Sequence, residues 1–178
     1  MVRGDDIHDD RPLVERARRG SRDAAGELVE RHWRSSWRVA RGITGDAATA
    51  EEVAQESLIS ALGALDRFDP GRGKFRAWLH RITVNRALNA TRRERRHTGL
   101  DSAEDVAAEA EAGVDARFLE AIATLKPPHR AVLVLRYGLD YAPPEIAAVL
   151  ELPVGTVNSR LARALAALRQ TMESPHAP

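Results

Sequence analysis

Cysteine is absent from the 178-residue chain, which excludes disulfide bonds, thiolate metal sites and cysteine nucleophiles. Aromatic residues make up only 4% of the sequence and long runs of β-branched residues are missing, so little favours a β-sheet. No apolar run approaches the ~20 residues that a membrane span requires, and we expect no membrane insertion. The N-terminus is acidic and lacks the apolar core of a signal peptide, so a cytoplasmic location is expected.

Alanine, leucine, arginine and glutamate are abundant, and these residues favour helices. We therefore predict an all-α fold. A length of 178 residues fits one large domain or two small ones.

The net charge of +1 conceals three segments of different charge. Residues 1–96 hold 20 Lys and Arg against 15 Asp and Glu, a net charge of +5. Residues 97–116 hold 6 acidic residues and no Lys or Arg, whereas residues 117–178 hold 7 basic against 5 acidic residues. Basic segments attract a phosphate backbone and an acidic segment does not, so the two ends of the chain are the candidates for nucleic-acid contact.

The acidic stretch also marks a domain boundary. Residues 97–114 have few large apolar side chains and charges of one sign, which predicts a flexible acidic linker. We place an N-terminal domain at residues 10–96 and a C-terminal domain at residues 115–172.

Each domain is predicted to contain four helices. In the N-terminal domain the apolar spacing and the capping residues predict helices at about 12–19, 23–43, 46–65 and 74–96. Either Asp46 or Thr49 would cap the third of these, and a glycine-rich loop at 68–73 follows it. In the C-terminal domain, helices at about 115–125 and 127–138 precede a pair of helices within 141–169.

The pair within 141–169 has the pattern of a helix-turn-helix. Its second helix has a buried stripe of Val157, Leu161, Leu165 and Leu168, and Thr156 is expected to cap it. In a helix-turn-helix the second helix enters the major groove of DNA, although an ordinary helical hairpin would show similar spacing. The polar residues opposite the stripe are Thr156, Asn158, Ser159, Arg160 and Arg163.

The helix predicted at 74–96 has a second basic face. Arg81, Asn85, Asn89 and Arg93 follow one another at a spacing of four residues. Asparagine is unfavourable inside helices, but its amide both donates and accepts hydrogen bonds, as base recognition requires. A solvated face with an arginine-rich end is the alternative, and the two asparagines favour nucleic acid. The flanking arginines are Arg86, Arg92 and Arg96, and the opposite side offers Phe75, Trp78, Leu79 and Ile82 to the core.

The third predicted helix is acidic instead. Its polar face is formed by Glu51, Glu52, Gln55 and Glu56, beside the apolar Val53, Leu58 and Ile59. Such a face is either simply solvated or a docking surface for a basic partner protein.

Enzyme chemistry finds no support in the sequence. The six histidines form no pair at i, i+4, and no phosphate-binding glycine loop is present. Glu51, Glu52 and Glu56 could attract a cation, but no loop fixes their geometry. We expect a protein that is not an enzyme and that needs neither metal nor cofactor.

The order of these features resembles the extracytoplasmic-function, or group 4, RNA polymerase sigma factors of the sigma-70 family. DAAGELVERHWRSSWRVARGITGD is similar to the first conserved region of the family, and AEEVAQESLISALGALDRFD to its polymerase-binding helix. GKFRAWLHRITVNRALNATRRERR resembles the element that melts and reads the −10 promoter DNA. The stretch LKPPHRAVLVLRYGLDYAPPEIAAVLELPVGTVNSRLARALAALR resembles the domain that reads the −35 element.

The resemblance implies that the chain is an alternative sigma factor. It would bind core RNA polymerase through the β′ coiled coil and the β flap, and it would recognise promoter DNA. An anti-sigma factor would hold it inactive. By position, polymerase contacts fall on Glu51, Glu52, Gln55, Glu56 and Leu58. Contacts to the −10 element fall on Phe68, Phe75, Arg81, Asn85, Asn89, Arg92 and Arg93. In the family, the segment that matches the 68–75 loop captures a flipped base. Contacts to the −35 element fall on Thr156, Asn158, Ser159, Arg160 and Arg163.

Some positions depart from the family pattern. Ala25 and Gly26 stand where an aromatic and a polar residue are usual, and Ala142 replaces a common Ser or Thr cap. Asn158 is often basic in the family, and Ala162 is often larger. Two other functions remain open at this point: a two-domain helix-turn-helix regulator that acts without polymerase, and a helical adaptor that binds only protein.

Overall fold

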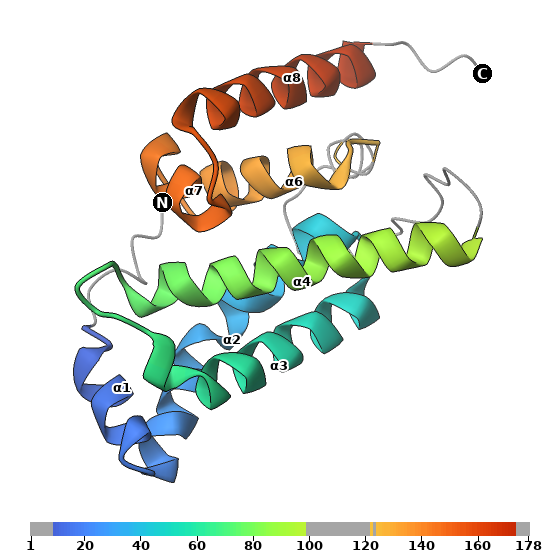
Figure 1. The fold of residues 1–178 in the computed structure, drawn as a ribbon. Helices are drawn as coiled ribbons and strands as arrows, with labels where there is room; N and C mark the ends of the chain where they lie inside the picture. Colours follow the sequence, from blue (N-terminus) through green and yellow to red (C-terminus); the bar gives the residue numbers. More distant parts are fainter. Residues whose placement is uncertain (1–8, 99–121, 123, 174–178) are drawn as a thin grey trace.

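The computed structural model describes residues 9–98, 122 and 124–173, and every regular element in these ranges is helical. The all-α fold predicted from composition is therefore confirmed. The chain forms two layers: α1 to α4 build the N-terminal layer, and α6 to α8 lie across one side of α4 (Figure 1). No helix among the described residues is long and apolar enough to cross a bilayer.

Four helices make up the N-terminal layer, as predicted. They are α1 (Arg11–Arg18), α2 (Arg22–Thr44), α3 (Ala47–Gly63) and α4 (Phe75–Thr98), with a short 3₁₀ turn, η1 (Leu65–Arg67), after α3. The Ser21 hydroxyl accepts the Ala24 N–H and starts α2. Gly45, in the left-handed region with φ 84°, ends it.

The start of α3 settles which of the two predicted caps is used. The Asp46 carboxylate accepts the N–H of Thr49 at 2.6 Å, so Asp46 is the cap and Thr49 lies inside the first turn. This hydrogen bond from the backbone, followed by one from the Thr49 side chain, lowers the pKa of Asp46 below its ordinary value.

A buried apolar cluster holds the N-terminal layer together. Leu28 of α2, Leu58 of α3 and Leu79 of α4 meet there, each at most 3% exposed. At one end of the cluster Phe68 and Phe75 pack edge to face, with ring centroids 5.6 Å apart. The Arg18 side chain on α1 donates to the backbone carbonyls of Leu65 and Phe68, which fixes the chain leaving η1.

The two departures from the family pattern, Ala25 and Gly26, lie outside the buried core of the N-terminal layer. Gly26 is exposed, and a Cβ added there would meet nothing within 4 Å. Ala25 is only half-buried.

The C-terminal layer consists of α6 (Pro127–Leu133), which continues as a π-helical turn, η2 (Val134–Gly138), then α7 (Pro143–Leu150) and α8 (Val154–Glu173). The helix predicted at 115–125 and the predicted linker at 97–114 lie largely outside the described residues.

The expected cap of α8 was wrong. The helix begins at Val154, two residues before Thr156, because the Pro153 carbonyl accepts the N–H groups of both Thr156 and Val157. Thr156 therefore lies within the first turn.

The missing Ser or Thr cap at Ala142 is compensated by two other features. Glu145 accepts the Ala142 N–H at 2.7 Å, which is the glutamate half of a capping box. Pro143 and Pro144, at the first two positions of α7, have no N–H that would need a partner.

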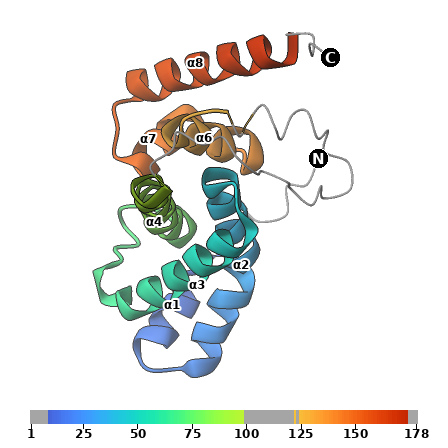
Figure 2. The ribbon, with the colours of Figure 1, turned by 90° about the vertical axis from the view of Figure 1, so that its right-hand side faces the viewer.

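Helix α4 lies on the side of the N-terminal layer that faces α6 and α7, as the end-on view in Figure 2 shows. On one side it packs on α2 and α3, and on the other side on α7 and α6. One buried cluster runs through both layers, joining Val39, Ile43 and Val84 to Val132 and Ile146. Because α4 packs against helices of both layers, this packing decides which of its residues remain accessible.

We predict that Asp46→Ala lowers the free energy of unfolding by about 1 kcal/mol at neutral pH, because the cap of α3 is lost. Asp46→Asn, which keeps a capping oxygen, loses much less. Since the folded pKa of Asp46 is depressed, the contribution of its charge is complete above about pH 4 and disappears as pH falls through the folded pKa. Urea unfolding of the three proteins at several pH values measures both effects. Equal stability of wild type and Asp46→Ala at pH 7 would contradict the assignment.

Candidate functional site

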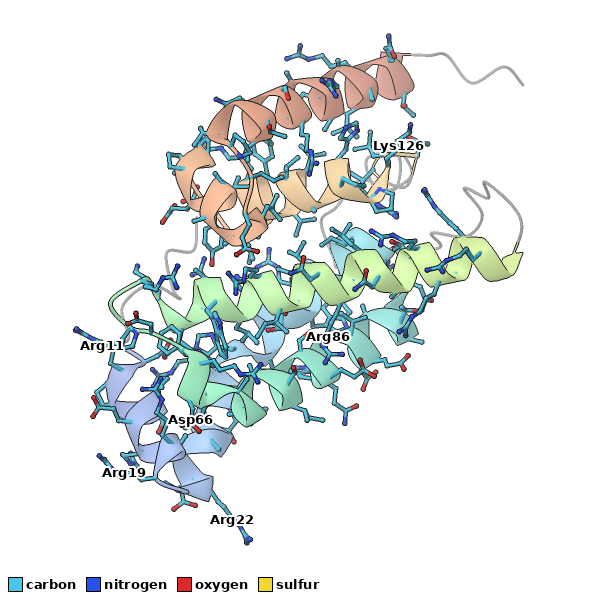
Figure 3. The ribbon with its side chains drawn as sticks, viewed as in Figure 1. Arg11, Arg19, Arg22, Asp66, Arg86 and Lys126 are labelled. Carbon is cyan, nitrogen blue, oxygen red and sulfur yellow. The ribbon has the colours of Figure 1, made fainter. Side chains whose placement is uncertain are left out.

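The acidic face of α3 is open to solvent. Glu51, Glu52, Gln55 and Glu56 are all exposed, as the sequence predicted. Glu56 forms an ion pair with Arg86 of α4 at 2.5 Å, and Figure 3 shows Arg86 between the two helices. The ion pair ties Glu56 to α4, and the side chains of Glu51, Glu52 and Gln55 are exposed.

Leu58 does not belong to this face. Its side chain is only 3% exposed and packs in the N-terminal core, so it cannot contact a partner directly. Ile59, by contrast, is 63% exposed and lies three and four residues after Glu56 and Gln55, on the same side of the helix. The sequence analysis assigned Leu58 to the polymerase contacts and placed Ile59 only beside them, whereas the structure exposes Ile59 and buries Leu58.

The asparagine stripe of α4 is exposed where it was predicted. Asn85 and Asn89 face solvent, as do Arg92 and Arg93 farther along the helix. Arg81 differs, because it is half-buried and forms an ion pair with Glu151, at the end of α7, at 2.7 Å. Four of the predicted residues therefore lie exposed along one helix. The fifth, Arg81, instead contacts the C-terminal layer through Glu151.

Phe68 and Phe75 are not exposed for base capture, contrary to the interpretation of the 68–75 loop. They are 5% and 2% exposed, and both contact Trp78 in the core. The residues between them, 69–74, are all exposed. The two rings therefore anchor the ends of the loop, and only the intervening residues can meet a base.

Helix α8 lies on the outside of the C-terminal layer (Figure 1), and several of its polar residues are exposed. Val157, Leu161 and Leu168 are buried beneath it, and Leu165 is half-buried, so the predicted apolar stripe is the packed side. Of the predicted polar residues, the exposed ones are Asn158 and Arg163, and the half-buried ones are Thr156, Ser159 and Arg160.

Small residues lie between these polar groups. Gly155, Ala162 and Ala166 are exposed on the same side of α8 as Ser159. The Ser159 hydroxyl donates to the Thr156 carbonyl at 2.9 Å, which holds that side chain close to the helix. The side chains at the centre of this face are therefore short, and the longer Asn158 and Arg163 lie at its edges.

The arginines of α8 influence a histidine on the neighbouring helix. Partial burial, followed by the charges of Arg163 and Arg160, lowers the pKa of His129 on α6. The His129 imidazole is therefore harder to protonate than a free imidazole, and the positive charge near it comes from Arg163, Arg160 and Lys126.

Within residues 9–98, 122 and 124–173, no group of three or more His, Asp or Glu side chains could hold a metal ion.

Comparison with known protein families matches both layers. The family model of sigma-70 region 2 matches residues 28–97, and that of sigma-70 region 4 matches residues 115–168. The first match spans α3 and α4 with most of α2, and the second spans α6, α7 and most of α8.

Individual relatives agree with these matches. The chain is 33% identical to the RNA polymerase sigma factor CnrH of Cupriavidus metallidurans, over 93% of this chain and 95% of the relative. It is 28% identical to the ECF RNA polymerase sigma factor SigW of Bacillus subtilis, over 89% and 94%.

Solved structures show the same likeness. The structure of CnrH in complex with the cytosolic domain of CnrY has a TM-score of 0.70, over 93% of this chain and 98% of that one. The sigma factor RpoE of Bartonella quintana, in complex with the anti-sigma factor NepR, shares the fold at 22% identity, with a TM-score of 0.72 over 85% of this chain and 98% of that one. The chain belongs to the sigma-70 family and is an extracytoplasmic-function RNA polymerase sigma factor, which binds core polymerase and directs transcription initiation at specific promoters.

Proposed function

We propose that this sigma factor divides its work among three surfaces on three helices. The acidic face of α3 docks on core polymerase, the asparagine stripe of α4 reads the −10 element, and the outer face of α8 reads the −35 element. The observation that carries this division is that each predicted surface is exposed on a different helix, with its own chemistry. We place the boundary between the two domains at residues 97–114.

Docking on polymerase uses Glu51, Glu52 and Gln55 around Ile59. Carboxylates favour a basic partner, which fits the β′ coiled coil implied by the family, and they orient the approach. Ile59 supplies the apolar contact, since burying an exposed isoleucine contributes about 1.5–3 kcal/mol. The C-terminal domain makes the second contact with polymerase, at the β flap.

Reading of the −10 element uses Asn85 and Asn89. Their amides can donate to and accept from base edges, and Arg92 and Arg93 neutralise the adjoining phosphates. Residues 69–74 receive the flipped base, on a frame held by the two buried phenylalanines. Melting then takes its free energy from binding the extruded strand rather than from a covalent step.

Reading of the −35 element uses the centre of the exposed face of α8, where the side chains are short. The major groove is about 12 Å wide and admits one helix, so small residues allow the backbone to approach the bases closely. Asn158 and Arg163 reach base edges at the sides, and Arg160 and Thr156 hold phosphates. Because Asn158 and Ala162 depart from the usual family pattern, the preferred −35 sequence is this chain's own.

Three further features complete the proposal. We infer that the protein carries no enzymatic activity, that it acts in the cytoplasm where polymerase is found, and that an anti-sigma factor holds it inactive. The family resemblance supports the last of these, as does the CnrH structure, which contains a second protein. Membership of the sigma-70 family argues against a regulator that never meets polymerase and against a purely protein-binding adaptor.

The function is tested by transcription in vitro with core polymerase on genomic fragments, followed by mapping of start sites. Start sites that share −10 and −35 sequences and depend on the added protein are expected. Absence of any complex with core polymerase would overturn the proposal.

We predict that Ile59→Ser weakens binding to core polymerase about tenfold or more, because a surface apolar contact is lost. Its melting temperature stays within a few degrees of wild type, since the side chain is exposed. Leu58→Ala is the contrasting variant: the loss of a buried leucine lowers the free energy of unfolding by about 2–5 kcal/mol. Titration of labelled core polymerase and thermal unfolding separate the two effects. Unchanged polymerase affinity in Ile59→Ser would remove Ile59 from the docking surface.

We predict that Asn158→Ala and Arg163→Ala each weaken promoter recognition by about 1–3 kcal/mol, and that the Asn158 change relaxes the sequence preference at one −35 position. Arg169→Ala is the matched control, since it removes a charge from the exposed side of α8 farther from the N-terminal turns that meet base edges. Transcription from a library of −35 variants measures preference and strength together. Equal losses in all three variants would indicate nonspecific charge rather than base reading.

A further inference from the structure

Helix α1 lies against the chain that leads into the 69–74 loop. It precedes residues 28–97, the stretch that matches sigma-70 region 2, and it packs beside η1 (Figure 1). Leu13 and Val14 bury its apolar side in the N-terminal core. The polar residues Asp10, at its N-cap, and Arg18, at its last position, make separate contacts that lead to the two ends of the loop.

Arg18 holds the chain that enters the loop. Its Nε and Nη2 atoms donate to the Leu65 carbonyl at 3.0 and 2.7 Å, and Nη2 also donates to the Phe68 carbonyl. These carbonyls lie at the first residue of η1 and just after its last residue, so one guanidinium fixes the whole turn. Arginine presents several donors in a rigid plane, whereas a lysine offers one flexible ammonium. The backbone at Phe68, where the loop begins, therefore depends on Arg18.

Asp10 acts on the other end of the loop through a histidine. Its Oδ2 atom accepts from His32 Nε2 at 2.9 Å, and its Oδ1 atom accepts from Arg31 at 2.9 Å. Burial alone would raise the pKa of Asp10, but the hydrogen bonds from His32 and Arg31 outweigh it and lower the pKa overall. The His32 ring is buried and packs against Phe75, the first residue of α4, with centroids 5.3 Å apart. Asp10 therefore orients the ring on which the end of the loop rests.

The two ends of the loop meet each other in the core, where Phe68 and Phe75 pack edge to face. Between them the loop forms a turn of its own. Asp69 Oδ1 accepts the Gly71 N–H at 2.8 Å, and the Asp69 carbonyl accepts the Arg72 N–H at 3.1 Å. Because the residues of this turn are all exposed, its direction follows from the position of the two phenylalanines.

We propose that α1 positions the loop that receives the −10 base, with Arg18 and Asp10 as positioning residues. This role rests on the base-receiving function proposed above for residues 69–74. A binding site needs its groups held within about 0.5 Å by the contacts behind them. Arg18 supplies such a contact through two carbonyls and Asp10 through His32, and neither residue touches DNA. Loss of either one changes how well the loop distinguishes bases and leaves the exposed faces of α3 and α8 as they are.

Base preference distinguishes positioning from general support of the fold. A destabilised protein yields fewer active molecules, which lowers transcription from every promoter by the same factor. A displaced loop instead lowers transcription from the preferred −10 sequence relative to other −10 sequences. The ratio of transcription between promoters that differ only in the −10 element therefore reports the position of the loop.

The variant Arg18→Met tests the first contact, because it keeps a long side chain and removes the donors. Arg19→Met is the matched control, since Arg19 is the next residue and is exposed. Each full-length protein is assembled with core polymerase and transcribes two libraries built on a start site mapped with wild type. One library varies the −10 element beside a fixed −35 element, and the other varies the −35 element beside a fixed −10 element.

Discrimination between −10 bases is expected to fall about fivefold or more in Arg18→Met, which is the scale of one lost base contact. Preference at the −35 element and affinity for core polymerase stay at the wild-type values, and Arg19→Met behaves as wild type throughout. Arg18→Lys recovers little, since one ammonium does not reproduce the fork that bridges both carbonyls. Unchanged −10 discrimination in Arg18→Met would overturn the proposal.

A second pair of variants tests the other end of the loop and does not depend on the folding of the first. Asp10→Ala removes the partner of His32, whereas Asp10→Asn keeps an oxygen that accepts the same hydrogen bond. Asp9→Ala is the control, because Asp9 is exposed and pairs with Arg11. The same loss of −10 discrimination is expected in Asp10→Ala, with recovery in Asp10→Asn. A loss of transcription shared equally by all members of both libraries would mean that α1 only supports the fold.

Variants of the loop itself separate this proposal from the proposed function. Asp69→Ala and Arg72→Ala change exposed residues between the two phenylalanines. If both variants keep the −10 discrimination of wild type, the base-receiving function of the loop is wrong. If they alter it while Arg18→Met and Asp10→Ala do not, only the role given to α1 is wrong.

Discussion

Helix α4 has to satisfy two packing surfaces at once, and the rest of the molecule depends on this constraint. Leu79 faces the N-terminal core and Val84 belongs to the cluster that runs into the C-terminal layer. With two sides occupied, only a narrow strip of the helix is left for solvent. Asn85 and Asn89 lie on that strip, so the burial of α4 sets which of its positions are exposed for the proposed reading of DNA.

The sequence predicted the helices well because their signals are local. Ser21, Asp46 and Gly45 act within a turn of their own position, and the apolar spacing of each helix identifies its packed side. The acidic face of α3 and the asparagine stripe of α4 were found in the same way. These features require no knowledge of what lies opposite a helix.

The errors concern contacts between residues distant in sequence. Spacing places Leu58 and Ile59 next to each other, but only packing against α2 and α4 decides which one is buried. Arg81 has the same exposed spacing as Asn85, yet its partner Glu151 is 70 residues away. Thr156 was misplaced for a different reason: a proline carbonyl starts α8 where a side-chain cap was expected.

Phe68 and Phe75 separate the stability of the core from the identity of the loop residues between them. They lie in the core and fix the ends of the loop, whereas the residues between them are exposed. Substitutions inside the loop therefore leave the core untouched. If the loop receives a base as proposed, the base that it accepts can change over evolution without a loss of stability, and a family built on this frame can acquire new promoters while keeping one fold.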